Sequence, residues 1–172
     1  MGITYTPTGC GTPSATPTFT PTGTATATAT ATPSGTCTPS GSTKIYNIAG
    51  FGAAGQTSTT RIYDVAANTW TTGASLPVGL ADLATAYENG KIYVAGGYNG
   101  SAAVNTLYIY DIATDTWSTG APMPAALYLP GFGAINGKVY IAGGNNGGSD
   151  LNTLYVYDIA TNTWRQAAAR SR

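Results

Sequence analysis

Few residues in this 172-residue chain belong to the types that carry out chemistry. The chain has no His, so an imidazole base, a His metal ligand and a Ser-His-Asp relay are all excluded. Three of the seven acidic residues, Asp64, Asp111 and Asp158, stand 47 residues apart and belong to a repeated framework. The other acids are scattered and give no carboxylate pair of the kind that glycosidases use. The sequence therefore predicts a non-enzymatic protein without catalytic residues or cofactors. The scattered acids are Asp82, Glu88, Asp115 and Asp150.

The only two cysteines, Cys10 and Cys37, lie in the first 43 residues. Two thiols without His are too few for a structural zinc site, so no metal site is expected. A disulfide between them would close a loop of 37 − 10 = 27 residues and would fit an oxidising compartment. Free thiols or intermolecular pairing are the alternatives.

Residues 1–43 differ in composition from the rest of the chain. They contain sixteen Thr, six Pro and four Ser, and Ile3, Tyr5 and Phe19 are their only large hydrophobic residues. Such a segment cannot bury a core, and its prolines favour an extended chain. We interpret it as a stalk of the O-glycosylated type. An unmodified disordered linker and an ordered Thr-rich β assembly are the alternatives.

The overall composition excludes several classes of partner and structure. Charged residues make up 8% of the chain, and the formal net charge is zero, which gives no basis for binding nucleic acid. No apolar run is long enough to insert into a membrane. The 23 Gly and 12 Tyr, with few Glu and Lys, favour strands and turns and predict almost no helix. The stalk and cysteines point to an extracellular or cell-surface protein. Because the sequence has no export signal of its own, we expect it to be a fragment.

Residues 44–172 repeat with a period of 47 residues. Lys44, Lys91 and Lys138 mark the interval, and the phrase from Lys91 to Gly97 returns almost unchanged 47 residues later. The repeats run over about 44–90, 91–137 and 138–172. In the middle copy, strands are expected at 83–87, 91–97 and 107–112 and around Trp117, with a hairpin turn at Asn89-Gly90. Four short strands per period of this length predict a propeller blade.

The spacing of the repeated residues resembles that of the kelch repeat. A Gly-Gly doublet is followed by Tyr-Asp thirteen residues after its second Gly, and by Trp seven residues after that Tyr. The first copy departs from this pattern, because Ala49 stands where the first Gly should be. The resemblance implies an all-β fold, a partial kelch-type β-propeller of about three four-stranded antiparallel blades after a disordered or extended N-terminal segment. The residues that it assigns to the structural framework are Gly50, Tyr63, Trp70, Gly96, Gly97, Tyr110, Trp117, Gly143, Gly144, Tyr157 and Trp164.

Binding residues are expected where the copies differ. The kelch resemblance places the loops 51–60, 98–104 and 145–151 on the same face as the inter-blade loops 75–82 and 122–130. These loops carry aromatic and amide side chains suited to sugars or polar peptides, although Asn, Asp and Gly are also ordinary turn residues. The candidate ligand-binding residues are Asp82, Tyr98, Asn99, Tyr128, Asn145, Asn146 and Asp150.

The leading functional hypothesis is an extracellular binding or display module for a glycan or protein ligand. One alternative is a structural protein of the cell surface, since 129/47 is about 2.7 periods and copies could self-associate to complete a propeller. Another is a non-catalytic part of a larger kelch-containing enzyme.

Overall fold

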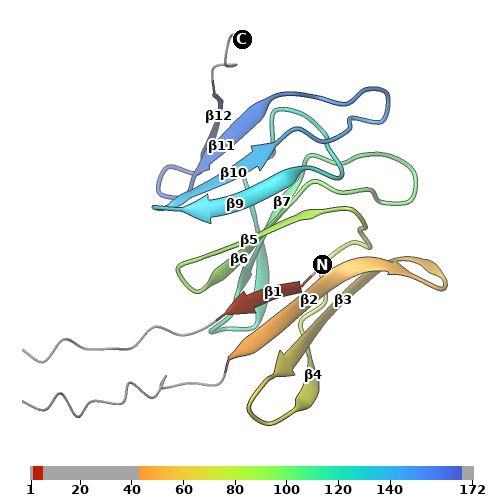
Figure 1. Ribbon diagram of the computed structural model, residues 1–172, viewed down its shortest axis with the longest axis vertical. Helices are drawn as coiled ribbons and strands as arrows, with labels where there is room; N and C mark the ends of the chain where they lie inside the picture. The colour runs from red at the N-terminus through yellow and green to blue at the C-terminus, as the bar shows by residue number, and fades with distance from the viewer. Residues whose placement is uncertain (1, 6–42, 168–172) are drawn as a thin grey trace, which may run out of the picture.

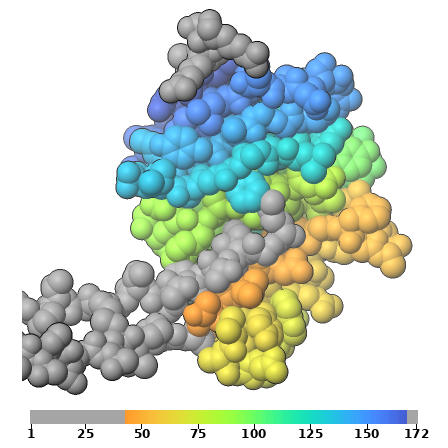
Figure 2. All heavy atoms as spheres, viewed as in Figure 1, coloured from red at the N-terminus to blue at the C-terminus, as the bar shows by residue number. Residues whose placement is uncertain are grey.

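The computed structural model describes residues 2–5 and 43–167, which form twelve β-strands and no helix. The strands make three four-stranded antiparallel sheets, each a meander in which neighbours in sequence pair. The sheets follow one another like segments of a fan (Figure 1), and the space-filling view shows them as successive bands (Figure 2). The expected all-β partial propeller of three blades is therefore confirmed. The expected Cys10–Cys37 disulfide and the glycosylated tract lie outside the described residues.

Each sheet takes its last three strands from one 47-residue repeat and its first strand from the residues that precede that repeat. The first contains β1 (Gly2–Tyr5), β2 (Lys44–Gly52), β3 (Gly55–Asp64) and β4 (Thr69–Gly73). The second contains β5 (Ala84–Glu88), β6 (Lys91–Ala95), β7 (Leu107–Asp111) and β8 (Thr116–Gly120). The third contains β9 (Gly131–Ile135), β10 (Lys138–Ala142), β11 (Leu154–Asp158) and β12 (Thr163–Gln166).

The first sheet takes its first strand from the segment that we interpreted as a stalk. Strand β1 pairs antiparallel with β2, and Tyr5 lies opposite Lys44. In the other two sheets the corresponding strands are joined by the two-residue turns Asn89-Gly90 and Asn136-Gly137, with φ between 51° and 76°. The first blade therefore begins before residue 43.

The segment 51–60 was expected to be a loop, and this expectation was wrong. Strand β2 continues to Gly52, and β3 begins at Gly55 with Gly52 as its partner. The ladder shifts register between Ile48 and Gly50, at Ala49, whose φ is 55°. This bulge lets the hairpin extend beyond the sheet. The second and third copies have loops of eleven residues at the same place, 96–106 and 143–153.

The core consists of two apolar clusters, one between each pair of neighbouring sheets. Between the first and second sheets, Tyr46 and Ile48 of β2 pack with Ile92, Val94 and Tyr110. The second and third sheets pack through the cluster that contains Tyr93, Leu107, Leu127, Val139, Ile141 and Tyr157. The copies therefore bury their faces against each other, as repeat proteins do. The described residues contain no helix that could cross a membrane.

Candidate ligand-binding face and the joints that position it

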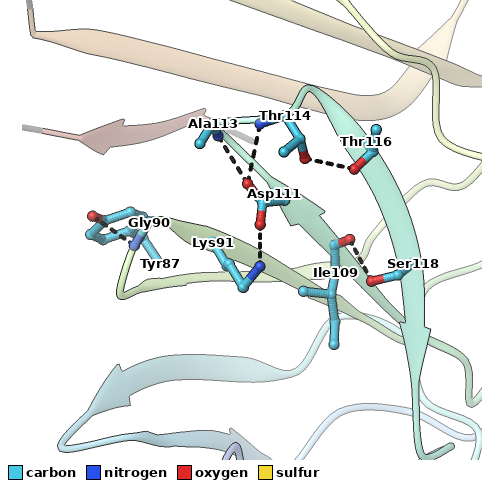
Figure 3. A network of polar contacts seen from close by, with 9 residues as sticks. All are labelled: Tyr87, Gly90, Lys91, Ile109, Asp111, Ala113, Thr114, Thr116 and Ser118. Atoms are coloured by element: carbon cyan, nitrogen blue, oxygen red, sulfur yellow. Dashed lines mark hydrogen bonds and ion pairs between the residues drawn. The ribbon is translucent and has the colours of Figure 1, made fainter.

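The repeated aspartates hold the turn between the third and fourth strands of each sheet. The Asp111 carboxylate accepts hydrogen bonds from the backbone N–H groups of Ala113 and Thr114, at 3.0 and 3.2 Å, and pairs with Lys91 (Figure 3). Lys91 is the residue opposite Asp111 in the ladder. The hydrogen bond from Lys91 is the main cause that lowers the pKa of Asp111. Asp64 and Asp158 accept the same turn bonds in their own copies. These carboxylates are thus engaged in structure.

The repeated Tyr and Trp side chains join one sheet to the next. Tyr110 packs on Trp117, with ring centroids 4.9 Å apart, and meets Tyr46 of the preceding sheet at 6.0 Å. The indole N–H of Trp117 donates to the carbonyl of Ala74, in the segment that links the two sheets, at 2.8 Å. We call this set of contacts between neighbouring sheets a joint. The joint between the second and third sheets repeats the geometry with Tyr157, Trp164, Tyr93 and the carbonyl of Ala121.

A polar residue in the turn before β8 or β12 completes each joint. The Asp115 carboxylate accepts hydrogen bonds from the hydroxyl of Tyr110 and from the backbone N–H of Ala74, the latter at 2.7 Å. Asn162 accepts the corresponding bonds in the second joint. The Ala74 N–H is the main cause that lowers the pKa of Asp115, while burial, reinforced by Asp115, raises the pKa of Tyr110. Burial also raises the pKa of Tyr93 to about 12.

The inter-strand and inter-blade loops meet on one side of the fan. Ala81 and Tyr98 exchange backbone hydrogen bonds of 2.8 and 2.9 Å, which ties the first inter-blade loop to the loop after β6. Tyr128 and Asn145 make the same exchange one blade later. In Figure 1 these loops lie on the right, opposite the hairpin turns that join β5 to β6 and β9 to β10.

Four of the seven predicted binding residues line one cavity on this face. Asp82, Tyr98, Tyr128 and Asn146 surround a volume of about 580 Å³. The Tyr98 and Tyr128 rings meet edge to face, with centroids 5.8 Å apart. The loops after β6 and β10 and the two inter-blade loops thus converge on one polar cavity. Two of its lining residues are aromatic, and we call it the tyrosine cavity.

The other three predicted residues lie outside the tyrosine cavity and make local turn contacts. The Asn99 side-chain oxygen accepts the N–H groups of Ser101 and Ala102, both at 2.9 Å. Asn145 donates through its Nδ2 to Asp150 at 2.8 Å and accepts the N–H of Gly147. These contacts fit the alternative interpretation of ordinary turn residues.

A second, apolar cavity lies next to the tyrosine cavity and was not predicted from the sequence. Its volume is about 340 Å³, and Asp82 lines both cavities. One signal could have revealed it: a period of 47 places Leu129 at the position of Asp82, and Phe51 at the position of Tyr98. Large apolar residues at positions that are otherwise polar suggest a contact surface. The apolar cavity is lined by Ile48, Gly50, Phe51, Ala81, Asp82, Leu83, Leu129 and Pro130.

No group of three or more potential metal-binding side chains occurs within residues 2–5 and 43–167.

Comparison with a family model agrees with this architecture. The model described as the KLHDC2/KLHL20/DRC7 Kelch-repeats domain matches residues 83–172, which is 90 of the 172 residues. A search of curated proteins finds no match. Kelch domains mediate protein–protein interactions and are typically non-catalytic. The chain belongs to the kelch-repeat family.

Proposed function

We propose that the loop face of this chain is a binding surface for a polypeptide segment of another protein. The observation that carries the proposal is the convergence of Asp82, Tyr98, Tyr128 and Asn146 on the tyrosine cavity. Its volume of about 580 Å³ is within the range of about 300–1,000 Å³ typical of ligand pockets. Tyr is enriched at protein-binding surfaces because it combines a large apolar face with a hydroxyl that hydrogen-bonds.

A random octapeptide library displayed on phage and selected on the full chain tests this function. We expect enriched peptides whose binding weakens by about 10-fold or more in the Tyr98→Ser, Tyr128→Ser double variant, because truncated anchors cost about 1–2 kcal/mol or more each. Thr72→Ser, on the exposed strand β4, is the control and should bind normally. Binding that ignores the tyrosine substitutions, or selective binding to a glycan array with no peptide enrichment, would contradict the proposal.

We further propose that the protein acts outside the cell or at its surface. Support comes from the Thr/Pro/Ser-rich composition of residues 1–43 and from the pair of cysteines. An exported chain whose mass does not change on O-deglycosylation would count against the glycosylated stalk.

A specific observation favours self-association as a second property. Each described joint combines a Tyr of one sheet with a Tyr-Trp pair of the next. The first sheet has a Tyr-Trp pair without such a Tyr from a preceding sheet, and the third sheet has the Tyr without a following Tyr-Trp pair among the described residues. Tyr63 and Trp70 are stacked at 5.0 Å and 40°, as in the two formed joints, yet Trp70 is 55% exposed and makes no hydrogen bond among the described residues. Tyr140, at the position of the buried Tyr46 and Tyr93, is partly exposed at the other end.

Two copies joined head to tail would match these halves twice and would close a ring of six blades. Light scattering should then give twice the chain mass of 17.4 kDa. Trp70→Glu should give the monomer, whereas Val65→Glu, which changes an exposed apolar residue in the turn between β3 and β4, should not. A native chain that is monomeric at high concentration would overturn this proposal.

A further inference from the structure

The two cavities of the loop face share a single side chain. Asp82 lines both of them, and among the residues that the structure describes it is the only charged one in either lining. Within residues 2–5 and 43–167 its carboxylate makes no hydrogen bond or ion pair, in contrast to the engaged carboxylates of Asp111, Asp115 and Asp158. An exposed carboxylate between an aromatic-walled cavity and an apolar one is placed to receive a cation.

Leu129 occupies the position equivalent to Asp82 in the third blade, and the fold does not require a leucine there. Both residues have a left-handed backbone, with φ of 53° for Asp82 and 54° for Leu129, and the Leu129 N–H donates to the Asp82 carbonyl at 2.8 Å. Asp tolerates this conformation, whereas it is unfavourable for leucine. The Leu129 side chain is also 65% exposed, so it contributes little to the core. A strained backbone at an exposed apolar residue points to a role in contact with a ligand.

Phe51 stands on the same cavity and is 76% exposed. It projects from the extended β2–β3 hairpin that distinguishes the first blade from the others, visible at the lower right of Figure 1. The buried side chains of Ile48 and Leu83 also line the cavity. Buried aliphatic groups with an exposed aromatic and an exposed aliphatic side chain suit one large apolar side chain of a partner.

The tyrosine cavity on the other side of Asp82 suits the cation. The faces of Tyr98 and Tyr128 attract ammonium and guanidinium groups, and the Asp82 carboxylate supplies the opposite charge. Because one carboxylate borders both cavities, the apolar group and the cation of the ligand must be close neighbours.

We propose that the loop face recognises a peptide in which a large apolar residue lies next to, or one residue from, a Lys or Arg. This inference rests on the proposed protein-binding function and specifies its ligand. The apolar side chain enters the cavity of Phe51 and Leu129, and the cation lies between Asp82 and the two tyrosines.

The octapeptide selection described above also tests this specificity. Enriched peptides should carry an aliphatic or aromatic residue within two positions of a Lys or Arg. For one synthetic peptide of this type, Asp82→Asn should weaken binding by about tenfold, and changing the peptide's basic residue to Gln should do the same. The two changes together should cost little more than either alone, which is the signature of a direct contact.

Two matched variants separate charge from apolar contact. Asp150→Asn removes one carboxylate from the same face but lies outside both cavities, and its side chain keeps the oxygen that accepts from Asn145; it should bind the peptide normally. Leu129→Asn, which suits the left-handed backbone, should weaken binding several-fold without lowering thermal stability.

The outcomes distinguish this inference from the function on which it rests. If enriched peptides lack basic residues, or if Asp82→Asn binds them as Asp150→Asn does, the specificity is wrong although peptide binding stands. If binding ignores both Asp82 and the two tyrosines, the proposed function itself is overturned.

Discussion

Replacing Gly96 with alanine should destabilise the chain by about 3 kcal/mol, the sum of an overpacking cost and a left-handed backbone cost. Gly96 has a φ of 64°, and a Cβ at this position would lie 2.4 Å from the backbone carbonyl oxygen of Leu127 and 2.9 Å from the Met123 side chain. The flexible methionine can move, but the carbonyl accepts the N–H of Gly97 at 2.7 Å and ties the next inter-blade segment to this sheet. The Leu127 carbonyl must therefore move away from residue 96, which loosens the contact between this segment and the second sheet. Urea unfolding followed by Trp fluorescence measures the loss.

Gly90→Ala is the matched control for this substitution. Gly90 also has a positive φ, of 76°, but no atom of the described part of the chain lies within 4 Å of its Cβ position. Only the backbone cost of about 1 kcal/mol is expected there. Equal losses for the two variants would show that the close approach to Leu127 contributes nothing to stability.

The first blade shows how the fold accommodates alanine at the position of Gly96. Ala49 stands there with a φ of 55°, and β3 bulges opposite it, where Ser58 and Thr59 face this one residue. The second and third sheets have no such bulge and keep glycine, at Gly96 and Gly143. The missing glycine is evident in the sequence, but its consequence, an extended hairpin in place of a loop, depends on how β2 and β3 pair.

The blades could be predicted because the same residue types recur at the same spacing in each copy. Asn89-Gly90 and Asn136-Gly137 fix hairpins by local turn chemistry, and the period places their strands. The pairing of β1 with β2 could not be found in this way, because Gly2–Tyr5 has no local turn that leads to Lys44. Pairing across such a separation is decided by the sheet that receives the strand.

The candidate site was predictable in its polar half only. Variation between copies and the kelch resemblance pointed to Asp82, Tyr98, Tyr128 and Asn146, which the structure brings to one cavity. The apolar cavity was not predicted, because Phe51 and Leu129 come from different blades and are brought to one cavity only when the sheets stack. Residue type and turn chemistry also could not separate Asn99 from Asn146, because each side chain accepts the same two turn bonds and only Asn146 lines the cavity.

Replacing Asp115 should also lower stability strongly, because this one exposed side chain accepts two hydrogen bonds in the joint between the first and second blades. Asp115→Ala should cost about 3 kcal/mol: about 1 kcal/mol for alanine at a φ of 52°, and about 1 kcal/mol for each of the two hydrogen bonds lost. Those bonds come from the Ala74 N–H and from the hydroxyl of Tyr110, a residue that is almost fully buried. Chemical denaturation at pH 7 measures the change.

Asp115→Asn is the matched control. At the equivalent position in the next joint, Asn162 accepts the corresponding hydrogen bonds from the Ala121 N–H and the Tyr157 hydroxyl. The Asp115→Asn substitution should change stability by less than about 1 kcal/mol at pH 7. Its pH dependence should differ from that of the native chain. The pKa of Asp115 is lower in the folded protein than its usual value near 3.8, so its charge stabilises the fold above that pH, and this contribution is lost as the pH falls through the lowered pKa. An asparagine does not titrate, and the variant should lose less stability than the native chain between pH 5 and pH 2. Equal acid sensitivity of the two proteins would show that Asp115 is not held as a carboxylate by Ala74 and Tyr110, and that acid unfolding comes from other groups, such as the ion pairs of Asp111 and Asp158.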